Sequence, residues 1–408
     1  MKRRVIRKES GSVLLIVLWT AVLLTILVTA MASKVRLSAR AAFNNQLAAD
    51  DYTQMISALN SAEMELLVEL MPPPVGTVQE TDAEGTPLNR LYRFDGRPLR
   101  LSYPTPDEFV VRIYNHAGKI NLNRIPRANM QLLIEYRLEQ LHGEEPDPEE
   151  VQELLAAWTD WTDLNDIEGI EGAEREYYEN LEPGFLPRNN PELDTVGELL
   201  HIRGFRELFE GINLEAAFTI YGNNRQVNLN LATREAMSLL PGLTPDLIEE
   251  IVLVRRLDPF ENRGEIGEIV PFENLAQLSP WISNETSSYY TLFVYRRPEV
   301  QSPEHSLQTD DERGARARNA ANFDLRDYPL AMPLMNESRA NEALSLLDSS
   351  LLEREDIEAM FARERAEDPW EIAPGLPRQG FSEIVEVNSF DSPPRVYQID
   401  PYGILPRH

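Results

Sequence analysis

The sequence contains no cysteine among its 408 residues, so it forms no disulfide bond and offers no thiolate as a metal ligand or nucleophile. Basic residues are also few, since 39 lysines and arginines face 67 acidic residues and the formal net charge is −28. A charge of this sign argues against broad contact with nucleic acid or anionic lipid headgroups, because both attract basic surfaces. It is compatible with the binding of divalent cations.

Signatures of catalysis are missing as well. The five histidines are scattered without H-E-x-x-H spacing, and the chain has no G-x-S-x-G turn and no glycine-rich phosphate loop. Hydrophobic residues make up 42% of the chain, which is enough for two or three domains with real cores. An enzyme is therefore the class that the sequence supports least, and we predict no catalytic residue.

Charge is absent from Ser12 to Ala32, directly after a basic leader, residues 1–11, that ends at Gly11. A secretory signal peptide has a shorter apolar core of about 7 to 15 residues, followed by a small-residue cleavage site. A membrane-spanning helix needs roughly 20 apolar residues, and this run is long enough. We therefore predict that residues 12–32 cross a membrane with the basic leader on the cytoplasmic side. The rest of the chain then lies outside the cytoplasm.

Glycine and proline are absent from Ser12 to Met71, and this stretch stops at the three prolines of residues 72–74. We predict one continuous helix over 12–71, whose first half lies in lipid and whose second half packs on a globular head. A span followed by a separate soluble helix is the alternative. The apolar residues beyond Ala32 recur at spacings near three and four, as on one buried helical face: Phe43, Leu47, Tyr52, Met55, Ile56, Leu59, Leu66, Leu67 and Leu70.

The remainder of the chain changes between strand-like and helical patterns. Residues 72–123 show β-like alternation with turn residues, residues 124–285 show helical periodicity, and strand character returns at 286–298. This order predicts a sheet whose strands flank a large helical insertion, mounted on the long helix. We interpret residues 299–408 as an acidic, partly disordered extension of unknown role with a late strand at RVYQID.

The helical region contains a short repeated motif and a helical hairpin. Asn-Leu-Asn precedes a helix at 121–123 and again at 228–230, where the second asparagine is expected to cap the helix. The second copy leads into LPGLTPDLIEEIVLVRR, which resembles the helix-hairpin-helix units of competence-type DNA receptors. A membrane-tethered DNA-binding receptor is thus an alternative function. We interpret the hairpin as packing architecture, because its flank carries acids that repel phosphate: Asp246, Glu249 and Glu250.

One segment, DWTDLNDIEGIEGAEREYY, concentrates acidic and amide side chains. Such a cluster repels itself unless it is solvated or shared by a cation. Calcium takes about six to eight oxygen ligands with tolerant geometry, and a glycine-containing loop between helices can wrap one. The spacing is not that of an EF-hand, so a solvated acidic loop remains the alternative to a calcium site. The residues concerned are Asp160, Asp163, Asn165, Asp166, Glu168, Glu171 and Glu174.

Several motifs occur in the order that is typical of one family: the basic leader, VLW in the apolar helix, GKINLN, WTDLND…GAEREYY, ELLHIRGF, VNLNLATREAMSLLPGL and SSYYTLFVYRR. Over roughly residues 1–297 the chain resembles the type II secretion minor pseudopilins called general secretion pathway protein K. This resemblance implies an α+β fold with a pilin-like antiparallel sheet interrupted by an α-helical domain. It implies a single-pass inner-membrane protein with its bulk in the periplasm. Its implied role is to cap the pseudopilus tip, initiate assembly and support export of folded proteins across the outer membrane.

The resemblance also implies partners and specific sites. A prepilin peptidase would cut after Gly11, and Ser12 would become an N-methylated terminus. Two other minor pseudopilins, the major pseudopilin and the inner-membrane assembly platform would be partners, and no nucleic acid would be bound. The family's calcium pattern falls on Asp163, Asn165, Asp166 and Glu174.

Two residues of the apolar helix are expected to matter for assembly. Trp19 belongs to the VLW motif, and Ile16 stands at the fifth position of the mature chain, where ordinary pilins have glutamate. We interpret Ile16 as the mark of a terminal position in the filament, because a first subunit has no predecessor whose N-terminal amine needs a counter-charge. The alternative is that Ile16 is one more lipid-facing residue.

Overall fold

The computed structural model describes residues 12–72, 90–99, 101, 103, 105, 108–181, 186–187, 190–296 and 379–404. These residues belong to two compact units, Met1–Ser57 and Ala58–His408. The leader that ends at Gly11, the proline run at 73–74 and most of the region 299–408 lie outside the described residues. The predicted leader peptide is therefore not a feature that the structure describes.

A single helix, α1 (Ser12–Glu69), runs through the first unit and into the second. Among the described residues it is the one helix that is long and apolar enough to cross a membrane, by length and composition. In the second unit, Ala58, Leu59, Ala62 and Leu66 of α1 are buried. Their spacing places them on one helical face, as the apolar pattern predicts for this part of the helix.

The predicted buried face of α1 is wrong for its middle part. Phe43, Leu47 and Tyr52 are about half exposed, at 49%, 48% and 52% of their surface. Helical spacing reports which residues share a face, but it does not report whether a neighbour covers that face. Among the residues of α1 whose burial the structure describes, the buried apolar residues begin at Ala58.

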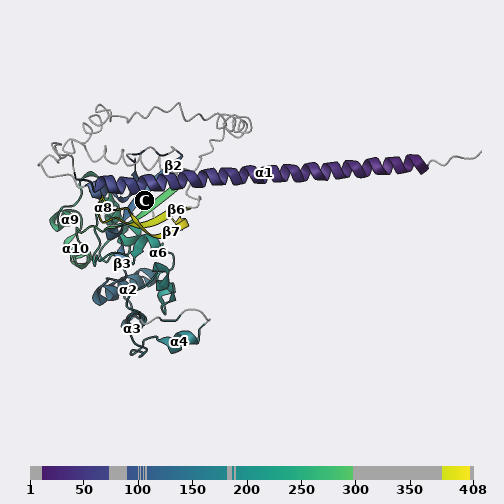
Figure 1. Ribbon diagram of the computed structural model, residues 1–408. Coiled ribbons are helices and arrows are strands. Elements are labelled where there is room, and N and C mark those ends of the chain that lie inside the picture. Colours follow the sequence, from purple (N-terminus) through teal and green to yellow (C-terminus); the bar gives the residue numbers. More distant parts are fainter. Residues whose placement is uncertain are drawn as a thin grey trace, which may run out of the picture. The chain divides into compact units, whose positions relative to one another are not determined.

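The second unit contains a five-stranded antiparallel sheet in the order β1-β2-β5-β6-β7. Figure 1 labels three of these strands, β2, β6 and β7. Residues of β2 are buried throughout, and β5 pairs with it over seven residue pairs from Phe109↔Arg296 to Asn115↔Tyr290. Consecutive buried apolar residues in a central strand follow from cover on both faces. The strands are β1 (Asp95–Leu99), β2 (Phe109–Asn115), β5 (Tyr289–Arg296), β6 (Gln379–Glu386) and β7 (Arg395–Ile404).

The interpretation of residues 299–408 as a mere extension is incomplete. Residues 379–404 form β6 and β7, which complete the sheet, and RVYQID lies within β7 as predicted. Strand β5, expected as the return strand after the helical insertion, is the central strand of the sheet. A neighbour that pairs across residues 297–378 gives no local signal in the sequence, because hairpin patterns depend on short turns.

The helical domain lies between β2 and β5 in the chain and has its own apolar core. Trp158 and Phe205 stack within this core at a ring-centroid distance of 5.9 Å. Its two-stranded parallel sheet joins β3 (Ile120–Asn121) and β4 (Phe218–Thr219). Its helices are α2 (Arg127–His142), α3 (Pro148–Trp161), α4 (Arg175–Glu179), α5 (Phe205–Leu208), α6 (Leu214–Ala217), α7 (Arg234–Met237), α8 (Pro245–Leu257), α9 (Arg263–Ile269) and α10 (Phe272–Leu278).

A buried histidine links the helical domain to the large sheet. The two ring nitrogens of His116 lie 2.7 Å from Thr219 Oγ1 and 2.8 Å from Thr291 Oγ1. Burial, together with the nearby Lys119, lowers the pKa of His116 well below its usual value, so the ring is neutral. A neutral imidazole has one donor and one acceptor, and the hydroxyl groups of two threonines match both.

Candidate metal site

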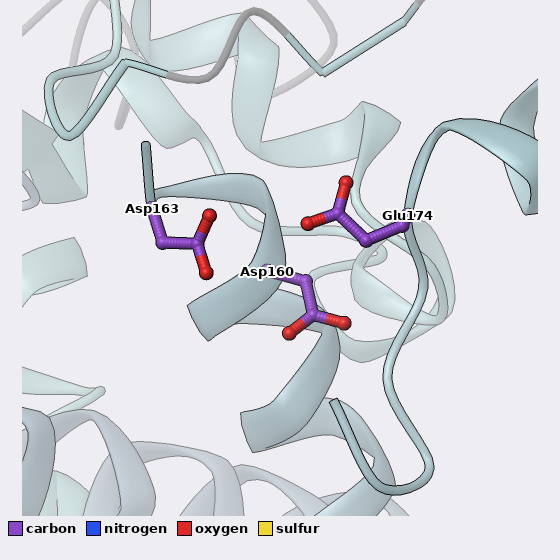
Figure 2. Close-up of side chains that lie close together, drawn as sticks. All are labelled: Asp160, Asp163 and Glu174. Atoms are coloured by element: carbon purple, nitrogen blue, oxygen red, sulfur yellow. The ribbon is translucent and has the colours of Figure 1, made fainter. Parts of the chain in front are cut away.

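Three carboxylates meet at the C-terminal end of α3. Asp160 lies in the last turn of that helix, Asp163 just beyond it, and Glu174 directly before α4. One carboxylate oxygen from each lies within 4.8 Å of those of the other two. Figure 2 shows the carboxylates of Asp163 and Glu174 facing each other across the end of the helix. Hard oxygen donors of this kind suit a hard cation such as calcium.

Asp160 holds the loop between the two helices in place. It is 4% exposed, and its Oδ2 accepts hydrogen bonds from the backbone N–H groups of Gly169 and Ala173, each at 3.0 Å. At Gly172 an added Cβ would lie 1.8 Å from the same oxygen. The close approach of this backbone to Asp160 therefore requires glycine at position 172.

Glu174 is the unusual member of the group. Its side chain is buried, at 3% exposure, and neither carboxylate oxygen has a hydrogen-bond partner among the described residues. Burial raises its pKa from 4.5 to about 6. The negative charges of Asp160, Asp163 and Asp166 raise the pKa further. A buried carboxylate without donors is costly to ionise, and a bound cation would remove this cost.

The structure brings together two of the four predicted ligands and adds Asp160. Asn165 donates from Nδ2 to Asp163 Oδ2 at 2.8 Å, while its own Oδ1 accepts from the Ile167 backbone N–H. Asp166 pairs with Arg175 at 3.6 Å. Asn165 and Asp166 thus lie outside the group of three, and their role as ligands stays a prediction. The sequence signal for Asp160 is its distance of one helical turn from Asp163 at the end of α3.

Replacing Asp160 with alanine is expected to destabilise the protein by about 2–5 kcal/mol in the presence of a chelator, because the buried N–H group of Ala173 and the partly buried N–H group of Gly169 lose their charged acceptor. Urea unfolding measures the change in the free energy of unfolding. The matched control is Asp166→Ala, since Asp166 lies in the same loop with an exposed ion pair that contributes little. Equal stability of the two variants would show that Asp160 does not hold the loop.

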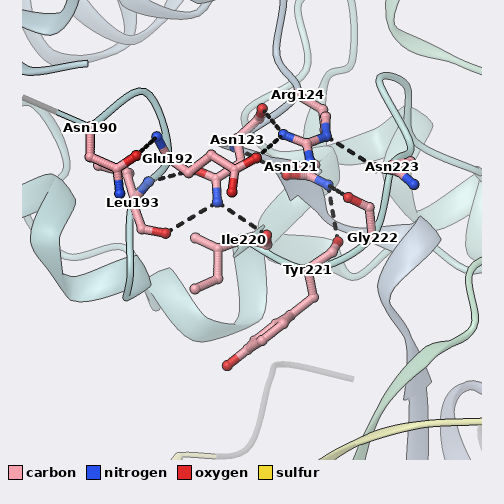
Figure 3. A network of polar contacts seen from close by, with 10 residues as sticks. All are labelled: Asn121, Asn123, Arg124, Asn190, Glu192, Leu193, Ile220, Tyr221, Gly222 and Asn223. Carbon is pink, nitrogen blue, oxygen red and sulfur yellow. Dashed lines mark hydrogen bonds and ion pairs between the residues drawn. The ribbon is translucent and has the colours of Figure 1, made fainter. Parts of the chain in front are cut away.

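The predicted helix caps at the two Asn-Leu-Asn motifs are wrong, because Pro126 caps α2 and Thr233 caps α7. The second asparagine of each motif instead pairs with both backbone groups of a distant residue, and Asn123 also donates to the Ile220 carbonyl at 3.2 Å. Asn123 accepts from Leu193 N–H at 2.8 Å and donates to its carbonyl at 3.1 Å, as Figure 3 shows. Asn230 does the same with Phe260, at 2.8 and 2.9 Å.

The hairpin turn between α7 and α8 is covered. Pro241, Gly242 and Leu243 are buried. Gly242 has φ +87°, and its carbonyl accepts from Asn274 Nδ2 at 2.8 Å. Turn amides in this setting cannot reach the phosphates of a duplex, and the turn serves packing. The geometry thus argues against the alternative of a DNA-binding receptor.

A comparison with family models agrees with the motifs in one part of the chain. Residues 118–209, which include the carboxylate group, match the family model of the type II secretion system (T2SS), protein K. Among solved structures, the chain is similar to one of the GspK-GspI-GspJ complex from the enterotoxigenic Escherichia coli type 2 secretion system. The identity is 16%, the TM-score is 0.37, and the match covers 61% of this chain and 88% of that chain. The search of curated proteins found no match. Over residues 118–209, the chain is therefore similar to the type II secretion system protein K family.

Proposed function

We propose that this protein is a minor pseudopilin that caps the tip of a type II secretion pseudopilus, starts its assembly and supports export of folded proteins across the outer membrane. The family match over residues 118–209 carries this proposal. The apolar helix α1, which is long enough to cross a membrane, supports it, because a pseudopilin must reside in the inner membrane before assembly. Its partners would be two other minor pseudopilins, the major pseudopilin and the inner-membrane assembly platform.

The tip position has a physical rationale in Ile16, which is 62% exposed on α1. In a subunit that joins an existing filament, a glutamate at this place can neutralise the terminal amine of its predecessor. This neutralisation offsets the penalty of roughly 2.5–3.5 kcal/mol for placing a charge at the depth of the bilayer centre. A first subunit has no predecessor and loses nothing with isoleucine. Labelling the head and imaging filaments tests this position: we expect label at one end, and label along the shaft would overturn the tip assignment.

Replacing Gly11 with leucine is expected to leave residues 1–11 attached to the protein. A prepilin peptidase that cuts after Gly11 would expose Ser12 as the methylated terminus, and a bulky residue at the cleavage position would block the cut. Intact mass measurement of the membrane-extracted protein distinguishes the two forms. A Gly85→Leu variant, outside the cleavage site, is the control. Retention of Met1 in the unmodified protein would contradict the proposal.

We further propose that the group of Asp160, Asp163 and Glu174 binds calcium. Two properties support a cation here: the three carboxylates share one small region, and the oxygens of buried Glu174 lack donors among the described residues. A bound calcium would neutralise this charge and link α3 to the start of α4. Its role is structural, and no catalytic role is proposed.

A further inference from the structure

The loop between α3 and α4 displays three large apolar side chains. Leu164, Ile167 and Ile170 are 73%, 77% and 93% exposed and lie three residues apart in the sequence. Single exposed apolar residues are common on protein surfaces, but several in one short loop mark an interaction site more often. Phe272, at 84% exposure, is a comparable but isolated residue at the start of α10.

The backbone of this loop is held by hydrogen bonds on both sides of the apolar residues. Asp163 accepts from the Asn165 backbone N–H at 2.9 Å, and Asn165 accepts from the Ile167 N–H at 2.8 Å. Arg203 donates to the carbonyls of Glu171 and Gly172, each at 2.9 Å. The three apolar side chains are therefore presented by a fixed backbone, so little conformational entropy is lost when a partner covers them.

The charges around the apolar residues indicate the kind of partner. Asp166, Glu168 and Glu171 are exposed in the same loop. Of the nearby arginines, Arg175 pairs with Asp166, and Arg203 donates to carbonyls of the loop. The rim of the loop is thus acidic, which opposes contact with an anionic membrane surface and favours a basic protein surface.

We propose that this loop, defined as residues 162–174, docks into an apolar recess rimmed by lysine and arginine on another folded protein of the secretion machinery. The apolar residues enter the recess and the acidic rim meets the basic one. This inference rests on the proposed role in secretion, but it concerns a surface that the role does not by itself assign.

Complementation of a deletion strain tests the surface. Exchanging for serine two isoleucines that a partner covers weakens a protein contact by more than about tenfold, so we expect Ile167→Ser/Ile170→Ser to lower secretion by a similar factor. The matched control, Phe272→Ser, removes an equally exposed apolar residue elsewhere and should secrete normally. Both purified variants should have the same melting temperature as the unmodified protein. Full secretion by the double variant would overturn the inference, whereas normal secretion by the deletion strain itself would overturn the proposed function.

Photo-crosslinking in cells tests the partner's chemistry. With benzoylphenylalanine at position 164, we expect one protein adduct, which weakens in the Glu168→Lys/Glu171→Lys variant and at raised salt. Its crosslinked residues should lie in an apolar recess beside lysine or arginine. An adduct with lipid, an adduct with a second copy of this chain, or no adduct would overturn the proposal, as would a yield that the charge-reversal variant leaves unchanged.

Discussion

Calcium at a hundredfold excess over its dissociation constant is expected to raise the melting temperature of the protein by about 5–10 °C. Binding to the folded state alone at that excess adds about 2.7 kcal/mol, and each kcal/mol shifts the melting temperature of a domain of this size by about 2–4 °C. The stabilisation comes from the group of Asp160, Asp163 and Glu174, whose neighbouring negative charges a bound cation neutralises. Calorimetry with calcium and with chelator measures the difference.

Two variants separate this site from general effects of calcium. Asp163→Ala removes one of the three carboxylates and should abolish the increment, while Asp246→Ala removes an exposed acid in the first turn of α8 and should retain it. If the unmodified protein melts at the same temperature with calcium and with chelator, the loop is merely solvated. An increment that Asp163→Ala retains would place the calcium elsewhere.

The increment should also depend on pH in a defined direction. The pKa of Glu174 is raised from 4.5 to about 6 in the folded protein, so the folded state holds its proton more tightly than the unfolded state. Without calcium, this group's contribution to stability is therefore present below pH 4.5 and lost as the pH rises to about 6. Calcium binds the ionised carboxylate, so its increment should grow as the pH rises through 6.

Replacing Asn230 with alanine is expected to destabilise the protein by about 2–5 kcal/mol, because the buried N–H and C=O groups of Phe260 both lose their partner. Asn230 is 2% exposed, so water cannot readily replace the lost bonds. Asn123→Ala removes the equivalent pair at Leu193 and a bond to the Ile220 carbonyl, but at a half-buried position where water can replace them, so its effect should be smaller. Urea unfolding measures both changes.

The control for this series is Asn224→Ala, which removes one exposed bond of 3.4 Å to Thr286 and should change stability by less than about 0.5 kcal/mol. If Asn230→Ala unfolds at the same urea concentration as this control, the pairing with Phe260 does not stabilise the domain. In that case the similarity of the two Asn-Leu-Asn motifs would have no energetic meaning.

Local patterns predicted the elements of this chain better than its long-range partners. The helix over 12–71 is present as Ser12–Glu69, because the absence of glycine and proline is a property of the segment itself. The predicted burial of Phe43 and Tyr52 is wrong, since burial requires a covering neighbour and periodicity does not reveal one. For the same reason, the pairing of β5 with β6 could not be read from the sequence.

In the candidate site, too, the sequence predicted the local segment but not every residue that the fold brings to it. The acidic composition of the loop indicated the segment in which Asp163 and Glu174 come together, and their role as calcium ligands stays a prediction. The inclusion of Asp160 depends on how the loop folds back onto the end of α3, through its bonds to Gly169 and Ala173. The asparagine motifs were expected to act on adjacent helices, yet Asn230 acts on Phe260. Side-chain bonds to distant backbone leave no periodic signal in the sequence.

Co-purification of the full-length protein from its own bacterium tests the central claim most directly. If the chain is a minor pseudopilin of the tip, detergent extraction with an affinity tag at the C-terminus should recover two other small pilin-like proteins in amounts equal to its own. Mass spectrometry identifies them by their prepilin leaders and apolar N-terminal helices. Recovery of the chain without any pilin-like protein, under conditions that keep α1 in detergent, would contradict the account.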